Sequence, residues 1–253
     1  MTKIRIITPL HSLSAAVSGS TLEELQPLEK LGIAFDEACL QSGPASIETH
    51  FDEVLCAPYT VAAAIEAEKA GVDAVIINCM GDPGLYAARE VVTMPVFGPC
   101  ETSLHVAAMM GHRFSVVSVL DSVRPMFERN ALLYGLAGKV ASLRMVNIPV
   151  LELEDGSPRL LERLLEQSRL AITEDHADCI VLGCTGFLGV AEQLEKKLHA
   201  AGHPVRVINP MPTTALIAAA FVHGGLAHSA AAYPSPNKEK PIIGFTMPTW
   251  RKK

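Results

Sequence analysis

The sequence lacks the features that mark membrane and secreted proteins. Its most apolar stretch, Ala215 to Val222, is far shorter than the roughly 20 residues that a helix needs to cross a bilayer. The first apolar run is interrupted by Lys3 and Arg5, so it has neither the apolar segment nor the small-residue cleavage site of a signal peptide. These absences predict a cytoplasmic protein that does not contact a membrane.

Positive charge is also scarce. The chain of 253 residues has a formal net charge of -6, and its lysines and arginines are scattered except at Arg251-Lys252-Lys253. Since a basic patch is the electrostatic footprint of nucleic-acid binding, no nucleic-acid partner is expected. Only 19% of the residues are charged while 49% are hydrophobic, and this composition predicts extensive burial and a homo-oligomer.

Motifs for disulfides, metals and nucleotides are missing as well. The 6 cysteines include no Cys-x-x-Cys pair, so reduced thiols are the default for a cytoplasmic protein of this size. His105 and His112 have helical spacing, but no third metal ligand lies near them in the sequence. No Gly-x-Gly-x-x-Gly accompanies Gly138 or Gly202, which are expected in turns or at helix ends. We therefore expect neither a metal nor an organic cofactor.

The chain does contain a regular alternation of short β-branched runs and longer helical patterns. This alternation is typical of an α/β fold with a parallel sheet and helices on both faces, and apolar runs such as Ala74-Val75-Ile76-Ile77 indicate strands buried on both sides. We predict strands at 4–8, 34–40, 74–78, 96–98, 114–119, 142–147, 179–183 and 205–208. We predict helices at 52–70, 83–90, 102–110, 123–134, 158–176, 187–200 and 213–222.

An internal repeat divides this pattern into two parts. The stretch from Val72 to Gly81 matches the stretch from Ala177 to Gly186 without a gap, at an offset of 184 - 79 = 105. Each copy places Cys-x-Gly at the end of a strand, followed by a helix and a second strand that ends on proline. The sequence therefore predicts two pseudo-symmetric α/β halves. The expected boundaries are 1–98 plus 211–233 for the first half, 99–210 for the second, and 234–253 for a C-terminal arm or tail.

The repeat puts Cys79 and Cys184 at the carboxyl ends of two strands, where open α/β sheets bind their ligands. Asp82 in the first copy and Thr185 in the second are expected to cap the following helices. Each thiol should then lie near a helix N-terminus that lowers its pKa. If a pseudo-twofold axis relates the halves, the two thiols face each other across a cleft.

Two opposed thiols suit racemisation or epimerisation. One thiolate removes a proton next to a carbonyl group, and the other thiol returns a proton to the opposite face. No cofactor is needed if the carbonyl groups of the substrate and nearby backbone donors stabilise the intermediate.

Other interpretations of these residues remain open. A strand-end cysteine can be a simple packing residue, and one activated cysteine would suffice as a nucleophile or proton donor. A fold that keeps its cleft can also serve as a non-catalytic binder of a small molecule. The occurrence of cysteine in both copies of the repeat favours the two-base reaction.

These motifs, together with the loop Gly43-Pro44-Ala45-Ser46-Ile47-Glu48, resemble the aspartate/glutamate/hydantoin racemase superfamily, and its hydantoin and allantoin racemase branch in particular. The resemblance covers roughly Ile4 to Gly225. It depends on three motifs in combination: Gly-Pro-x-Ser-Ile-Glu, Cys79-Met80-Gly81-Asp82-Pro83-Gly84 and Gly183-Cys184-Thr185-Gly186.

The resemblance implies two flavodoxin-like halves with the active site in the cleft between them. It also implies a cofactor-independent isomerase whose small-molecule substrate is a hydantoin-like ring or a related amino-acid derivative. Proton transfer is assigned to Cys79 and Cys184. The implied substrate-binding residues are Thr8, Ser46, Ile47, Met80, Gly81, Thr185 and Gly186. The alternative within the superfamily is a maleate isomerase or malonate decarboxylase that uses one activated cysteine.

The segment after the first strand departs from the family pattern. The family usually carries Asn-Pro-Asn there, whereas this chain has Thr8-Pro9-Leu10-His11. A hydroxyl group and an apolar side chain replace the two carboxamides, and the histidine that follows is expected in a solvent-facing loop. This difference predicts a substrate that is not the same as those of the named branch.

Overall fold

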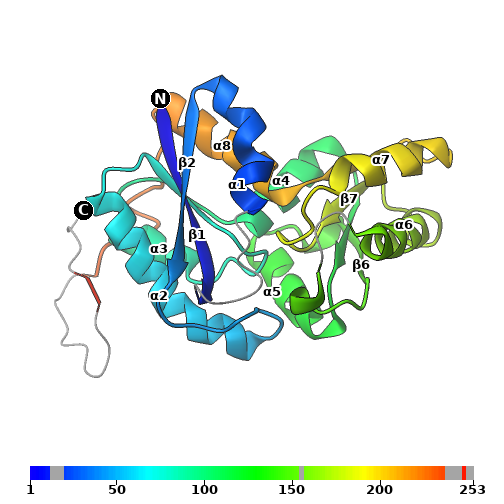
Figure 1. The fold of residues 1–253 in the computed structure, drawn as a ribbon, viewed down its shortest axis with the longest axis horizontal. Helices are drawn as coiled ribbons and strands as arrows, with labels where there is room; N and C mark the ends of the chain where they lie inside the picture. Colours follow the sequence, from blue (N-terminus) through cyan, green and yellow to red (C-terminus); the bar gives the residue numbers. More distant parts are fainter. Residues whose placement is uncertain (12–19, 154–156, 237–246, 249–253) are drawn as a thin grey trace.

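The computed structural model describes residues 1–11, 20–153, 157–236 and 247–248, which form two α/β halves (Figure 1). The first contains a parallel sheet with the strand order β2 (Ile33–Leu40), β1 (Thr2–His11), β3 (Ala74–Ile77) and β4 (Val96–Phe97). The second repeats this order with β6 (Val140–Met145), β5 (Phe114–Ser118), β7 (Cys179–Leu182) and β8 (Arg206–Ile208). Both sheets have the first four strands of the flavodoxin order, so the predicted fold class is confirmed.

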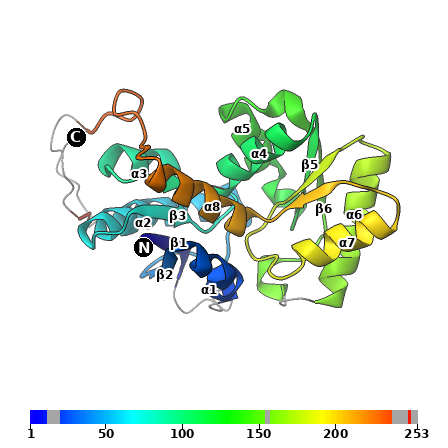
Figure 2. The ribbon, with the colours of Figure 1, turned by 90° about the horizontal axis from the view of Figure 1, so that it is seen from above.

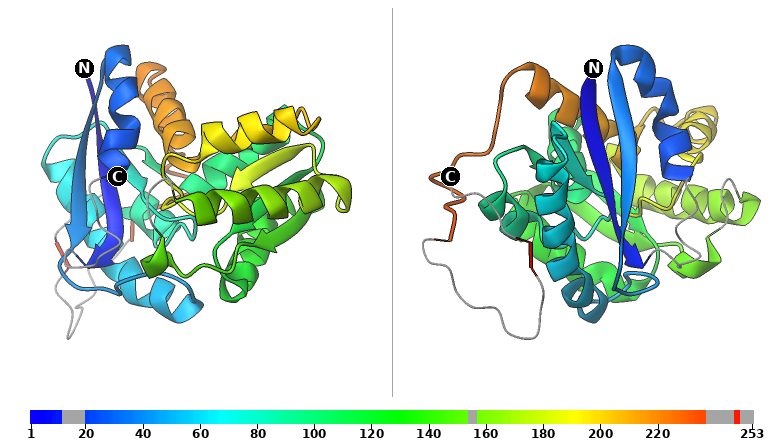
Figure 3. Two further views of the ribbon diagram at one scale, coloured as in Figure 1. Left: turned by 45° about the vertical axis from the view of Figure 1, so that its right-hand side comes forward. Right: turned by 60° about the vertical axis from the view of Figure 1, so that its left-hand side comes forward.

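Helices cover both faces of the first sheet. On one face α1 (Ser20–Leu25) and α8 (Pro210–His223) pack against Ala74 and Ile76 of β3. On the other face α2 (His50–Lys69) and α3 (Leu85–Val91) pack against Val75 and Ile77. Figure 3 (right) shows α1 and α2 on opposite sides of β1 and β2. The continuous apolar run of β3 follows from this burial, because successive side chains of a strand point to opposite faces.

The second sheet is covered in the same way. The helices α4 (Pro99–Met110) and α5 (Arg124–Leu133) pack on one face, and α6 (Pro158–Thr173) and α7 (Ala191–Ala200) cover the other (Figure 2). The chain then returns to the first sheet through α8, which also packs against α4 and so joins the halves. Short 3-10 helices lie at Gln26–Leu31, Asp121–Val123, Ala137–Lys139 and Val150–Glu152. None of the described helices has the length and apolar character needed to cross a membrane.

All eight predicted strands and all seven predicted helices have counterparts in the structure, although several ends differ. The first strand runs on to His11, so this histidine ends a strand and does not lie in the expected loop. The sequence prediction contained no helix at Ser20–Leu25, although Ser20 and Glu23 have the spacing of a capping box. The sixth strand begins earlier than predicted, at Val140. The helix predicted from 187 begins only at Ala191. Of the predicted arm at 234–253, residues 237–246 and 249–253 lie outside the described residues.

The repeat extends to the starts of the central strands. The carboxylate of Asp73 accepts a hydrogen bond from the Lys3 N–H at 2.7 Å, and that of Asp178 accepts one from the His112 N–H at 2.8 Å. The backbone N–H groups of Asp73 and Asp178 donate in turn to the carbonyl oxygens of Lys3 and Arg113. These aspartates hold neighbouring strands in register at the end of each sheet that is remote from the cysteines.

Candidate active site

The carboxyl ends of β1 and β3 meet those of β5 and β7 at one cavity of about 130 Å³. This volume is below the roughly 300–1,000 Å³ of pockets for drug-sized ligands and suits a single small ring. The described side chains that line the cavity are all uncharged, and both Cys79 and Cys184 are among them.

The two thiols occupy equivalent turns. The Sγ atom of Cys79, directly after β3, accepts a hydrogen bond from the Gly81 N–H at 3.3 Å. The Sγ atom of Cys184, directly after β7, accepts one from the Gly186 N–H, also at 3.3 Å. Both residues line the same cavity. Pseudo-symmetry therefore extends from the strands to the two sulfur atoms and their hydrogen-bond donors.

Burial sets the acidity of both groups. It raises the pKa of Cys79 well above its usual value and the pKa of Cys184 to about 11. The N–H groups of Gly81 and Gly186 oppose this shift, and the negative charge of Glu48 adds to it at Cys184. Both side chains are consequently thiols at neutral pH when no ligand is bound.

The predicted lowering of the thiol pKa by helix N-termini is wrong. The helices after the two cysteines begin only at Leu85 and Ala191, and the N–H groups that donate to the sulfur atoms are those of Gly81 and Gly186, before either helix. The nearest donors belong to turns instead. Thr185 is not a helix cap either, because α7 has Val190 at its N-cap position. The Thr185 hydroxyl donates to the carbonyl oxygen of Asn78 at 3.4 Å.

Asp82 caps a different helix from the one predicted. The N-cap residue of α3 is Gly84, whereas the Asp82 carboxylate accepts hydrogen bonds from the N–H groups of Cys100 at 3.0 Å and Glu101 at 2.8 Å. Both donors lie in the first turn of α4. The Tyr134 hydroxyl donates to the same carboxylate at 2.7 Å. The carboxylate therefore ties the turn after β3 to the start of α4.

We expect Asp82→Asn to lower the free energy of unfolding by about 1–3 kcal/mol, because the amide provides one acceptor oxygen where the carboxylate provides two.

Burial raises the pKa of Asp82 to about 7, above its value of about 3.9 in an unfolded chain. The folded protein thus binds this proton more tightly than the unfolded chain does. The free energy of unfolding of the wild type should therefore decrease as the pH rises from about 4 to about 7. Urea denaturation across this range should show a flatter dependence in Asp82→Asn; an unchanged dependence would contradict the assignment.

The structure places most of the predicted site residues at one cavity. Its lining includes Thr8, Ile47, Met80, Gly81, Thr185 and Gly186 in addition to the two cysteines. Ser46 is not part of the lining. It is half-buried beside Ile47, which does line the cavity.

Sequence reasoning missed Asn78 and Thr21, which also line the cavity. The Asn78 Nδ2 atom donates to the hydroxyl oxygens of Thr8 at 3.0 Å and Thr21 at 3.2 Å. The Asn78 Oδ1 atom is buried and has no hydrogen-bond partner among the described residues. The repeat itself could have drawn attention to Asn78, because the first copy has a polar side chain at the position where the second copy has Gly183.

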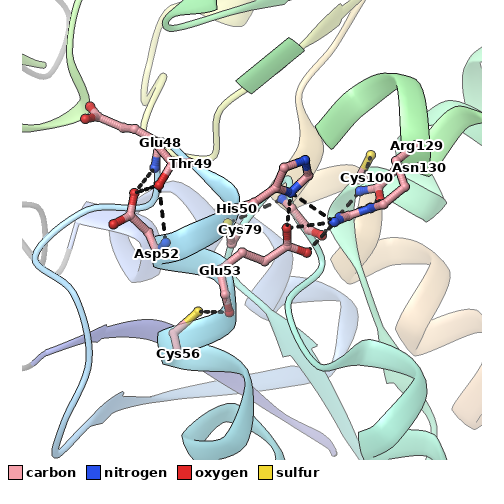
Figure 4. A network of polar contacts seen from close by, with 11 residues as sticks. Glu48, Thr49, His50, Asp52, Glu53, Cys56, Cys79, Cys100, Arg129 and Asn130 are labelled. Carbon is pink, nitrogen blue, oxygen red and sulfur yellow. Dashed lines mark hydrogen bonds and ion pairs between the residues drawn. The ribbon is translucent and has the colours of Figure 1, made fainter. Parts of the chain in front are cut away.

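Polar contacts connect the two halves beside the cavity (Figure 4). Arg129 of α5 donates to the Glu53 carboxylate of α2 at 2.7 Å, and Glu48 accepts a hydrogen bond from the Val150 N–H at 2.5 Å. Thr49 caps α2 by accepting from the Asp52 N–H. These contacts attach the loop before α2 to the second half. Ile47 of this loop and Val150 of the second half both line the cavity.

In the part of the lining that the structure describes, the thiols are the only titratable side chains, so they are the side chains there that could transfer a proton. The turn N–H groups beside them can stabilise a thiolate or hold an oxygen atom of a ligand. Among the described residues, no group of three or more His, Cys, Asp or Glu side chains is arranged to hold a metal ion.

Comparisons with known proteins agree with this geometry. A family model described as Asp/Glu/Hydantoin racemase matches residues 14–218. A hydantoin racemase from Pseudomonas sp. (strain NS671) is 42% identical over 156 residues, which are 62% of this chain and 63% of that protein. Another hydantoin racemase, from Paenarthrobacter aurescens, is 32% identical over 240 residues, which are 94% of this chain and 99% of that protein. The structure of an allantoin racemase from Klebsiella pneumoniae has 32% identity and a TM-score of 0.88, covering 97% of this chain and 98% of that one.

Proposed function

The chain belongs to the Asp/Glu/hydantoin racemase family, and we propose that it inverts one carbon of a hydantoin-like ring by proton transfer between Cys79 and Cys184. Its enzyme class is that of the isomerases, of the racemase type. Hydantoin and allantoin racemases are among its relatives. The proposed reaction uses no cofactor.

The observation that carries the two-base mechanism is the equivalence of the two thiols. Each follows a central strand, each accepts a hydrogen bond from the N–H two residues later, and both line the same cavity. A packing role would require neither the matched turn nor the shared cavity.

The uncharged lining supports a neutral ring as the substrate. An amino acid or a malonate brings one or two carboxylates, and the described part of the lining has no Lys, Arg or His side chain that could pair with them. A hydantoin instead presents carbonyl oxygens and N–H groups, which hydroxyl, carboxamide and backbone groups can bind. The hydrogen atom that is removed lies on the carbon beside a ring carbonyl.

In the forward reaction the thiolate of one cysteine takes the proton from this carbon. The electron pair of the broken C–H bond moves toward the adjacent carbonyl and forms a planar enolate. The thiol of the other cysteine then donates its proton to the opposite face, which leaves that sulfur as the thiolate. The two residues exchange roles for the other enantiomer.

The raised thiol pKa values predict a steep pH dependence. Because the free enzyme must lose a proton to form the thiolate, kcat/KM should rise about tenfold for each pH unit from about pH 6 to pH 8. Initial rates at low substrate concentration would measure this slope. A plateau below about pH 7 would show that the thiolate is already formed and would contradict the proposed acidity.

The proposed reaction can be tested by polarimetry and by deuterium incorporation from D2O, using 5-monosubstituted hydantoins, allantoin and free amino acids as substrates. We expect racemisation and exchange with one or more of the cyclic compounds. Turnover of free amino acids alone would show that the ring proposal is wrong. Protection of the cysteines from alkylation by a ligand that undergoes no exchange would identify a binding protein instead.

A further inference from the structure

The turn that carries Cys79 is held by a side chain from the other half of the molecule. The Asn130 Nδ2 atom, on α5, donates a hydrogen bond to the Gly81 carbonyl oxygen at 3.2 Å. The Asp82 N–H, in the same peptide unit, donates to the Cys79 carbonyl oxygen at 3.1 Å. Both polar groups of this peptide unit are thus fixed, and Gly81 is the residue whose own N–H donates to the Cys79 sulfur.

The backbone of this turn needs contacts from outside to keep its shape. Asp82 has a φ of 52°, in the left-handed region that non-glycine residues rarely occupy. Such a conformation persists only where the surrounding structure imposes it. The Asp82 carboxylate is anchored at the start of α4, and Asn130 anchors the peptide unit before it. A Cβ atom on Gly81 would lie 2.9 Å from the Met126 Sδ atom, so α5 also packs closely against the turn.

Arg129 determines the orientation of the Asn130 carboxamide. Its Nε and Nη2 atoms donate to the Asn130 Oδ1 atom at 3.1 Å and 2.9 Å. Because an arginine side chain has donors and no acceptor, the oxygen end of the amide faces Arg129 and the NH2 end faces Gly81. Arg129 in turn binds the Glu53 carboxylate of α2 (Figure 4). Asn130 is only 2% exposed, so its side chain is held on both sides in the interior.

The turn that carries Cys184 is held differently. The Phe187 N–H donates to the Cys184 carbonyl oxygen at 3.2 Å, as the Asp82 N–H does in the first turn, but Phe187 does not have a positive φ. Within the described part of the chain, no side chain donates to the Gly186 carbonyl oxygen. The two turns therefore match in their own hydrogen bonds, but only the first receives one from a side chain of the opposite half.

We propose that Asn130 is a positioning residue for Cys79: by holding the Gly81 carbonyl group, it keeps the Gly81 N–H directed at the Cys79 sulfur and supports the thiolate of this cysteine alone. The inference rests on the proposed function in that Cys79 exchanges a proton with the substrate. An N–H donor stabilises a thiolate more than a thiol, because hydrogen bonds to charged atoms are the stronger ones. Loss of the alignment therefore reduces the fraction of Cys79 that is thiolate at a given pH.

Alkylation by iodoacetamide, followed for each cysteine by mass spectrometry, measures this effect without a substrate. In Asn130→Ala we expect Cys79 to react about threefold or more slowly than in the wild type at pH 8, because less thiolate is present. Cys184 should react at about its wild-type rate. A turn that was merely looser would expose the sulfur and make Cys79 react faster. Faster or unchanged alkylation of Cys79 would overturn the proposal.

Hydrogen exchange at C5 of the enantiomers of 5-methylhydantoin in D2O locates the effect in the reaction. In a Cys184→Ala background only Cys79 can remove the proton, and adding Asn130→Ala should lower the exchange rate about three- to tenfold. In a Cys79→Ala background the same addition should leave the rate within about twofold. Equal losses in the two backgrounds would show a general structural role and overturn the proposal.

Ser115→Ala is the matched control. The buried Ser115 shares a hydrogen bond with Ser142 at 2.8 Å in the same half as Asn130, but it does not line the cavity. We expect this variant to keep the wild-type alkylation rates of both active-site cysteines. The wild-type protein provides a test that needs no variant to fold, because the Asn130 NH2 group should be protected from hydrogen exchange in NMR spectra. Rapid exchange of this group would overturn the proposal.

The two readouts separate this inference from the proposed reaction. Slower alkylation of Cys79 in Asn130→Ala, without C5 exchange by the wild type, would support the role of Asn130 and contradict the proton transfer. C5 exchange by the wild type, with unchanged alkylation in Asn130→Ala, would support the proton transfer and contradict the role of Asn130.

Discussion

Replacing either Cys79 or Cys184 by alanine is expected to lower the rate of racemisation by roughly 10²- to 10⁴-fold, the usual contribution of a general acid or base. In the proposed mechanism inversion needs both residues, because one sulfur removes the proton and the other returns a proton to the opposite face. The two losses should be similar in size, since the two thiols lie in equivalent turns on the same cavity.

Deuterium exchange distinguishes this mechanism from one that uses a single cysteine. In each alanine variant the remaining cysteine faces the α-hydrogen of only one enantiomer. Cys79→Ala and Cys184→Ala should therefore retain slow exchange with opposite enantiomers, while the rate of racemisation falls in both by the factor given above. Cys39→Ala is a suitable control, because Cys39 is half-buried in β2 and does not line the cavity. Near-normal turnover in either active-site variant would rule out two-base inversion.

Gly183→Ala is expected to lower the free energy of unfolding by about 1–3 kcal/mol and to reduce activity in the same variant. The added Cβ atom would lie 2.5 Å from the Ser118 Cβ atom and 2.8 Å from the Val116 Cγ1 atom, in the interior of the second half. The strand end must shift to relieve these contacts, and Cys184 is the next residue. Urea denaturation and initial rates measure the two effects.

Gly138→Ala is the matched control for this prediction. A Cβ atom on Gly138 would meet no other atom within 4 Å, so we expect stability within about 0.5 kcal/mol of the wild type. If Gly183→Ala were as stable and as active as this control, the close packing behind Cys184 would not constrain the thiol.

Much of the fold could be predicted from the sequence because its signals are local. Runs such as Ala74 to Ile77 are apolar on both faces only where helices cover both sides of a sheet, and the structure shows such helices around β3. The gapless repeat likewise placed Cys79 and Cys184 at matching strand ends. Helix α1 was missed because it has only 6 residues and little apolar periodicity.

The details of the site were less predictable, because they depend on partners far away in the sequence. Asp82 has the local pattern of a cap for α3, yet its carboxylate reaches Cys100 and Glu101 at the start of α4. The hydrogen bond of Asn78 to Thr8 joins residues that are 70 positions apart. No spacing rule within one segment can foresee contacts of this kind.

The sequence by itself determined the alternation of strands and helices, the repeat and the placement of one cysteine at the end of each central strand, because side-chain periodicity and strand order are properties of neighbouring residues. Only the tertiary structure decided that burial raises the pKa of both thiols, that Ser46 does not line the cavity and that the Asn78 oxygen has no partner. Desolvation and hydrogen bonding depend on how distant segments pack, and that information is absent from the local pattern.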